Sequence, residues 1–284
     1  MVINPVLMLD NHYCSRVTHP IMKPFRSFPQ QTKLKIQYVL TDIDDTLTLS
    51  GRLPAVAYTA MELLKESGIQ VVPITGRPAG WCDHIARMWP VAGVVGENGA
   101  FYFRYDEARK KMLRHYFASE KERQENRLKL AKLKRLILKN VPGSGVSADQ
   151  AFREADLAID FCEDVPPLPR EAIDTIVRLF TEAGAQAKES SIHVNGWFGK
   201  YDKLTMTKIF FADIFSQALT TGKDRIIFTG DSPNDCPMFA YFPHSVGVAN
   251  IIDFKGRLDH EPAWITDEPG GGGFAEMAEI LLSR

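Results

Sequence analysis

The sequence predicts an α/β protein in which a Rossmann-like core domain with a parallel sheet is combined with a smaller α+β domain. Between residues 36 and 95, short apolar runs alternate with helical patterns at the spacing of βαβ units. From about Phe101 the pattern changes, and a strand and helix pattern returns near Lys203. The length of 284 residues is sufficient for a core domain and a smaller second domain.

The first part of the parallel sheet is expected to contain three strands and two helices. A buried strand is predicted at 36–41 because the run is short, apolar and rich in β-branched and aromatic residues. The following helix begins at Pro54, ends at Gly68 and is expected to bury Val56, Ala60, Leu63 and Leu64. The remaining elements are strands at 69–74 and 91–95, with a helix at 78–88 between them.

Residues 101–195 are predicted to form the second, smaller domain, which divides the core domain into residues 36–100 and 196–284. Its charged helix, 120–140, carries an apolar stripe at Leu130, Leu133 and Ile137. Basic residues on this helix alternate with Glu residues, so a solvated face is expected rather than an RNA-binding face. The other expected elements are a hairpin at 101–105 and 112–117, strands at 157–161, 186–188 and 191–194, and a helix at 170–183.

The last part of the chain returns to the core domain. A helix is expected to begin at Lys203 and to bury Met206, Ile209, Phe210 and Ile214. Strands are predicted at 226–229, 246–248 and 264–266, with a final helix at 274–282. The four glycines 270–273 are expected to form a flexible turn, because no GK[ST] follows them as in a phosphate-binding loop.

Composition excludes several classes of function. A net charge of −1 argues against nucleic-acid binding, and no apolar run approaches the ~18 residues of a membrane span. The four scattered cysteines form no CxxC, which indicates neither a zinc nor a redox site and favours a reduced, cytoplasmic location. Residues 1–35 contain four prolines and no sustained period, so an irregular N-terminal arm is expected. The oligomeric state is not specified by these patterns.

Acidic residues gather where the first predicted strand ends. Asp42 and Asp44 are two positions apart, so their side chains point to the same side of an extended chain. Two converging carboxylates repel each other unless a cation lies between them or one of them keeps a proton. A solvated turn is the alternative for a lone pair of this kind. Two further polar groups, 75–77 and 230–235, also follow predicted strands, and ligands of parallel sheets lie at such strand ends.

In these motifs the sequence resembles the haloacid dehalogenase (HAD) superfamily of phosphohydrolases over about residues 36–284. The segment 42–47 resembles the first motif of the family, Thr75 the second, Lys203 the third and 230–235 the fourth. The segments 96–100, 245–250 and 273–276 are similar to those of its Cof-type members, subfamily IIB. One departure is Asp45, where the family usually has Gly; both central acids remain in place.

The resemblance implies a role for each acidic residue. Asp42 would attack phosphorus and form an aspartyl-phosphate. Asp44 would give a proton to the leaving group and then activate water, and it would bind the metal through its main-chain carbonyl. Asp42 and Asp231 would bind Mg²⁺ through their side chains, with Asn234 and Asp235 completing the metal site or orienting its ligands or the lysine.

The remaining candidate residues would contact the phosphate or the rest of the substrate. Thr75 would donate a hydrogen bond to a phosphoryl oxygen, together with backbone amides of the Gly76 turn. Lys203 would supply a positive charge, a role for which Lys200 and Lys208 compete. Arg77 and Asn98 follow predicted strand ends and are candidate polar contacts. Four residues that lead into the Lys203 helix are candidates to line the cleft: His193, Asn195, Trp197 and Tyr201.

The resemblance therefore implies a magnesium-dependent phosphatase that acts on a small phosphorylated metabolite, with a sugar phosphate as the first choice. A flavin or pyridoxal phosphate would fit the same motifs. The inserted segment 101–195 would be a cap that covers the site and selects the substrate. A phosphomutase of similar architecture is the nearest alternative. A non-catalytic ligand-binding regulator is disfavoured, because all four motif positions are filled.

Overall fold

The computed structural model describes residues 22–190 and 192–283, and its centre is a six-stranded parallel sheet. The order of the strands is β1-β13-β12-β11-β2-β3, and every neighbouring pair is parallel. The predicted α/β class is thereby confirmed. The strands are β1 Lys23–Pro24, β2 Tyr38–Thr41, β3 Gln70–Pro73, β11 Ile226–Gly230, β12 His244–Gly247 and β13 Trp264–Ile265.

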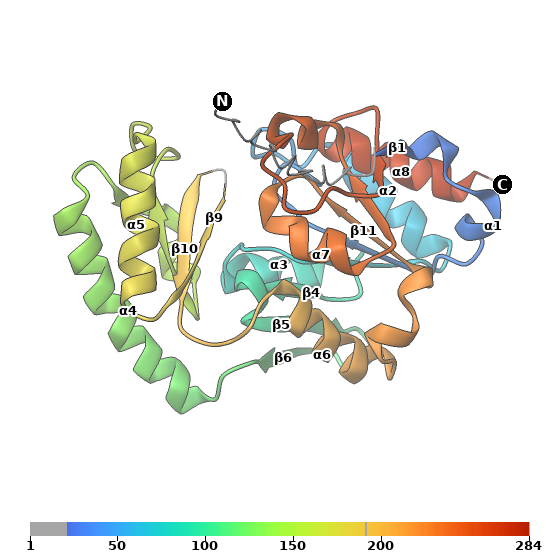
Figure 1. The fold of residues 1–284 in the computed structure, drawn as a ribbon. Helices are drawn as coiled ribbons and strands as arrows, with labels where there is room; N and C mark the ends of the chain where they lie inside the picture. The colour runs from blue at the N-terminus through green and yellow to red at the C-terminus, as the bar shows by residue number, and fades with distance from the viewer. Residues whose placement is uncertain (1–21, 191, 284) are drawn as a thin grey trace, which may run out of the picture.

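Helices cover both faces of this sheet (Figure 1). Val39 and Val71 point into an apolar cluster with α2, α3 and α8, whereas the next residues, Leu40 and Val72, point into a cluster with α6 and α7. This alternation follows from the period of two in an extended strand, and it buries the central strands on both sides. The helices are α2 Ala55–Glu66, α3 Ala79–Met88, α6 Lys203–Phe215, α7 Cys236–Tyr241 and α8 Gly270–Leu282.

The buried face of α2 agrees with the prediction in part. Ala60 and Leu64 are buried as expected, whereas Val56 and Leu63 are 54% and 47% exposed and Ala57 and Met61 are buried in their place. The side of α2 that faces the apolar cluster shared with α8 is therefore rotated from the predicted side.

A small antiparallel sheet lies beside the core sheet in the order β4-β5-β6. Its strands are β4 Val94–Gly96, β5 Phe101–Asp106 and β6 Lys111–Tyr116. The strand β4 is parallel to the core sheet, as predicted, because Val95 forms a parallel bridge with Ile74 and its carbonyl accepts a hydrogen bond from the N–H of Thr75 at 2.9 Å. Its other edge pairs antiparallel with β5. Phe101 and Phe103 of β5 are buried in the same cluster as α2 and α3.

A separate four-stranded sheet lies at a distance from the core sheet (Figure 1), in the order β7-β8-β10-β9. It is antiparallel throughout. Its apolar cluster includes residues of α4 and α5, and the predicted stripe of α4 is buried. The elements are β7 Gly145–Val146, β8 Asp156–Asp160, β9 Gln186–Glu189, β10 His193–Trp197, α4 Glu120–Asn140 and α5 Arg170–Glu182.

The described part of the predicted N-terminal arm packs on the core. Residues 22–35 contain the edge strand β1, a 3₁₀ turn Phe25–Ser27 and the short helix α1 Gln30–Lys33. Phe25 and Phe28 are buried in the main cluster, where their rings contact Trp264. The sequence of this segment has no regular hydrophobic period, because two single aromatic side chains, Phe25 and Phe28, hold it on the core. Residues 1–21 lie outside the described residues. Within the described chain, no helix has both the length and the apolar character that crossing a bilayer requires.

Candidate active site

The carboxyl ends of two neighbouring strands place the first and fourth motifs side by side. Asp42 follows β2 and Asp231 follows β11, and these strands are parallel neighbours with Thr41 opposite Thr229. The backbone N–H of Asp42 donates to the carbonyl of Thr229 at 2.9 Å. Because parallel strands end at the same edge, the two carboxylates converge although they are far apart in the sequence.

A buried lysine joins this group of acids. Lys203 begins α6, whose N-cap is Asp202, and its Nζ lies 2.6 Å from Asp42 Oδ1 and 2.9 Å from Asp235 Oδ1. Carboxylate oxygens of Asp42, Asp231 and Asp235 all lie within 4.8 Å of one another, and all three residues are buried. The two competing lysines, 200 and 208, are exposed. The structure thus brings Lys203 to the acids expected from the motifs.

Burial controls the electrostatics of the cluster. Burial raises the pKa of Asp42 to about 7, an effect that the charge of Lys203 opposes and the charge of Asp235 reinforces. Burial, followed by the charges of Asp235 and Asp42, also raises the pKa of Asp231. The pKa of Lys203 is raised by the two acids it contacts in spite of its burial. Three carboxylates and one ammonium group leave an excess of negative charge, and such a set of oxygens is suited to a hard cation such as Mg²⁺.

The loop after Asp42 is held by residues that sequence reasoning left without a role. Thr46 Oγ1 donates to Asp231 Oδ1 at 3.0 Å, and Asn250 Nδ2 donates to the carbonyl of Asp45 at 3.0 Å. Asp45 has a φ of 54°, in the left-handed region that Gly adopts freely and that Asp tolerates. The departure from Gly at this position is therefore compatible with the turn. The sequence feature that could have identified Asn250 was its position in the Cof-like segment 245–250.

The four glycines 270–273 form the first turn of α8, so the prediction of a flexible turn was wrong. A Cβ atom on Gly271 would lie 2.5 Å from the carbonyl oxygen of Leu47, and one on Gly270 would lie 2.6 Å from that of Thr48. Both oxygens belong to the loop that carries Asp42 and Asp44. The glycines thus allow α8 to approach this loop closely, which composition alone did not reveal.

Arg77 pairs with Asp44 in a bidentate ion pair. Its Nε donates to both carboxylate oxygens of Asp44, at 2.9 and 3.0 Å, and its Nη2 donates to Oδ1 at 2.7 Å. The Asp44 side chain is 35% exposed, and Arg77 Nη1 is also 3.9 Å from Asp149 Oδ2. The neighbouring carboxylates raise the pKa of Arg77 against the effect of burial. The contact of Arg77 with substrate stays a prediction, and the structure adds that its guanidinium orients Asp44.

The second motif forms a tight turn after β3. Thr75 is fully buried, and its Oγ1 accepts a hydrogen bond from the backbone N–H of Arg77 at 3.0 Å. The Asn98 side chain packs on Gly76, where an added Cβ would lie 3.2 Å from it. Gly76, Arg77 and Asn98 all line the cleft described next, whereas Thr75 is not among its lining residues.

A cleft of about 790 Å³ lies between the acids and the four-stranded sheet. Asp42, Asp44, Asp231 and Asn234 line it from the core side. The opposite wall includes Arg153, Glu163, His193 and Asn195. Two of the four residues expected here therefore line the cleft. Trp197 and Tyr201 are instead buried in the main apolar cluster and stack on each other.

Comparisons with known proteins agree with this geometry. Residues 39–141 match the haloacid dehalogenase-like hydrolase family, while no curated protein gives a significant match. A solved Thermoplasma acidophilum protein is 18% identical, with a TM-score of 0.65, over 87% of this chain and 98% of that one. A Plasmodium vivax protein described as HAD/COF-like is 17% identical, with a TM-score of 0.62, over 87% of this chain and 95% of that one. A subclass IIB sugar phosphatase is 14% identical, with a TM-score of 0.58, over 86% of this chain and 98% of that one.

Identities this low establish a shared fold and no more than that. The shared fold is α/β, with a parallel six-stranded core sheet and separate antiparallel sheets. Residues 39–141 resemble the haloacid dehalogenase-like hydrolase family, and the solved structures with this fold include a HAD/COF-like protein and a member of subclass IIB.

Proposed function

We propose that the protein is a magnesium-dependent phosphatase that hydrolyses a small phosphate monoester through an aspartyl-phosphate on Asp42. The observation that carries this proposal is the contact of Lys203 with Asp42 and Asp235 beside Asp231. Asp42 and Asp231 line the cleft. One carboxylate oxygen of Asp42 is bound by Lys203. The other oxygen has no hydrogen bond among the described residues, and we assign it the attack on phosphorus.

In the first step, a bond forms between Asp42 and phosphorus while the ester bond to the leaving oxygen breaks. Lys203 and the backbone amides of the Gly76 turn reduce the negative charge on the phosphoryl oxygens. The hydroxyl of Thr75 is assigned a hydrogen bond to the same oxygens. In the second step, water attacks the aspartyl-phosphate, releases inorganic phosphate and restores Asp42.

Asp44 is proposed to give a proton to the leaving alkoxide and to take one from the attacking water. Its ion pair with Arg77 holds the carboxylate in place through both of its oxygens. Proton donation therefore requires Arg77 to release one of these oxygens for contact with the leaving group. Asp149, whose Oδ2 lies 3.9 Å from Arg77 Nη1, is within reach as the new partner.

Mg²⁺ is proposed to be held by the side chains of Asp42 and Asp231 and by the main-chain carbonyl of Asp44. Asp235 orients the lysine, and Asn234 lies at the cleft where it can complete the site. When bound, the ion offsets the negative charge of the phosphoryl group and of the buried acids. The donor set fits this ion, because hard oxygen ligands are what Mg²⁺ prefers.

The cap is proposed to be the inserted segment 101–195, with residues 36–100 and 196–284 as the core domain and residues 1–35 as an N-terminal arm. Within this segment, the hairpin of β5 and β6 packs on the core, and the four-stranded sheet supplies the opposite wall of the cleft. His193, Asn195 and Glu163 on that wall are hydrogen-bonding groups, which favours a leaving group with hydroxyls. These groups support a sugar phosphate as the first choice, and Phe161 and Phe254, which also line the cleft, keep a flavin or pyridoxal phosphate as the alternative.

The test is release of inorganic phosphate from p-nitrophenyl phosphate and from a panel of phosphorylated metabolites, with and without Mg²⁺. We expect magnesium-dependent release that Asp42→Asn abolishes. Transfer of phosphate to a second hydroxyl without steady release would identify a mutase instead. Binding of metabolites without any turnover would identify a regulator, and either result would refute the proposed activity.

A further inference from the structure

A buried carboxylate outside the acid cluster joins the two walls of the cleft. Glu97 is fully buried and its φ is 42°, a left-handed conformation that is uncommon for Glu. Its Oε1 accepts hydrogen bonds from the backbone N–H groups of Ala79, at the start of α3, and Glu154. Its Oε2 accepts from those of Ala155 and Asp156, at 2.6 and 3.2 Å. One core-domain side chain thus binds three successive amides at the start of β8.

Arg153 makes the reciprocal contact from the opposite wall. Its Nη1 donates to the carbonyl of Gly76 at 3.0 Å, so it reaches the turn assigned to phosphate binding. The same guanidinium binds Asp156 through Nη1 and Asp149 through Nε and Nη2, at 2.8 to 3.1 Å. The Arg153 side chain is only 2% exposed. A surface ion pair contributes little to stability, but a buried set in which every donor is paired fixes one geometry.

The cluster continues to groups that face the cleft. Asp156 Oδ2 accepts a hydrogen bond from Asn195 Nδ2 at 3.0 Å, and Asn195 lines the cleft from the four-stranded sheet. On the core side, Asn98 follows Glu97 directly and lines the cleft as well. The position of polar groups on both walls therefore depends on the same contacts.

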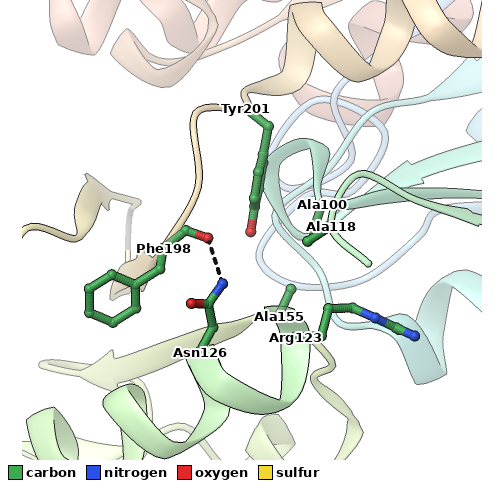
Figure 2. Close-up of a pocket in the computed structure, with 7 residues that line it drawn as sticks. All are labelled: Ala100, Ala118, Arg123, Asn126, Ala155, Phe198 and Tyr201. Carbon is green, nitrogen blue, oxygen red and sulfur yellow. Dashed lines mark hydrogen bonds between the residues drawn. The ribbon is translucent and has the colours of Figure 1, made fainter. Parts of the chain in front are cut away.

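The chain crosses between the two sheets close to this cluster. Figure 2 shows a small cavity lined by Ala155, Ala118, Phe198 and Tyr201. The chain crosses between the sheets at Ala118 and again from Phe198 to Tyr201. Ala155 lies between Glu154 and Asp156, whose amides Glu97 also binds. Asn126 of α4 donates to the carbonyl of Phe198 at 3.2 Å. If only these two chain crossings joined the sheets, the four-stranded sheet could rotate about the line between them. The contacts of Glu97 and Arg153 form a third attachment, which prevents this rotation.

We propose that Glu97 and Arg153 are positioning residues that lock the four-stranded sheet onto the Gly76 turn and keep the two walls of the cleft in one arrangement during turnover. Glu97 supplies the acceptor for the cap-side amides, and Arg153 supplies the donor to the core-side carbonyl. Neither residue takes part in bond making. The consequence for substrate affinity rests on the phosphatase activity proposed above, whereas the attachment itself does not.

The test uses Glu97→Gln, which keeps shape but replaces one acceptor oxygen by an amide group that cannot accept a backbone N–H. Hydrogen exchange at residues 154–156 is expected to become at least about tenfold faster, the effect of leaving a buried backbone N–H without its acceptor. Trypsin cleavage after Arg153 should accelerate by about the same factor, since the buried side chain becomes accessible. Exchange in β2 and β11 should stay unchanged. The matched control is Glu182→Gln, at an exposed pair with Arg178.

A kinetic measurement separates positioning from general stability. With glucose 6-phosphate as the probe, or any other ester that the wild type hydrolyses, Glu97→Gln should raise KM about tenfold and change kcat by less than about threefold. If Glu97→Gln does not fold, Arg153→Lys, with Arg178→Lys as its control, is subjected to the same measurements. Unchanged exchange and cleavage at 153–156 would overturn the proposal. A wild type without phosphatase activity would refute the proposed function, and exchange and cleavage would still decide on the attachment.

Discussion

Replacing Asp42 by Asn tests the electrostatics of the buried acids through stability rather than activity. Burial raises the pKa of Asp42 from its ordinary value of 3.8 to about 7. Between these two pH values the unfolded chain has lost a proton that the folded protein retains, so the stability of the wild type falls as the pH rises. Each pKa unit corresponds to 1.36 kcal/mol, so the raised pKa of Asp42 lowers the free energy of unfolding by about 4 kcal/mol as the pH rises through this range.

The assay is urea unfolding of the wild type and Asp42→Asn in EDTA, at several pH values from 4 to 8. The stability difference in favour of the variant should grow by about 4 kcal/mol over this range, because Asn has no proton to lose. Lys203 keeps its contact with Asp235 in the variant, at 2.9 Å, so the lysine is not left unpaired. Comparing the change with pH, rather than one value, removes the constant cost of the lost hydrogen bond.

Magnesium provides the second half of the same experiment. A cation held by the acids stabilises their charged forms, so it should stabilise the wild type more at pH 8 than at pH 5. The variant lacks one ligand and should gain much less. A stability difference that is independent of pH, together with an equal response of both proteins to Mg²⁺, would refute the reasoning.

Three further substitutions test the packing and the charge balance around the site. Lys203→Met should cost about 3–5 kcal/mol in urea unfolding and reduce phosphate release at least about 100-fold, because it leaves buried carboxylates without their cation; equal activity would exclude a role in charge stabilisation. Gly271→Ala should lower stability by about 1–3 kcal/mol through overpacking against the loop that carries the acids. Gly272→Ala is its control, because an added Cβ there meets its nearest neighbour at 3.5 Å and should be tolerated. Thr46→Val should weaken Mg²⁺ binding by about 10-fold or more in a titration, because its hydroxyl orients Asp231 at 3.0 Å; an unchanged affinity would contradict this.

The parts of the fold that sequence predicted well are those with strong local signals. The apolar stripe of α4 has a clear helical period, and Leu130, Leu133 and Ile137 are buried as expected. The strands β2 and β11 are short apolar runs followed by acids, and both are buried central strands. In these segments, local period and burial agree, so the pattern alone was sufficient.

The parts that sequence missed depend on partners that are distant in the chain. The inward face of α2 differs from the predicted one because Ala57 and Met61, not Val56 and Leu63, pack into the apolar cluster shared with α8. Gly271 looked like part of a flexible turn, although its lack of a side chain lets α8 approach the carbonyl oxygen of Leu47 in the loop that carries the acids. The ion pair between Arg77 and Asp44 joins two motifs that sequence reasoning had treated as independent. None of these contacts leaves a signature in local period or spacing.

The most direct test of the central claim is to locate the phosphoryl group in a rapidly quenched reaction. The enzyme is mixed with p-nitrophenyl phosphate and Mg²⁺, quenched in acid within one turnover, digested and analysed by mass spectrometry. We predict one phosphoryl group on the peptide that contains Asp42, and none in Asp42→Asn. Phosphate release without any modified peptide, or with the phosphoryl group on a different residue, would contradict the assignment of Asp42 as the nucleophile.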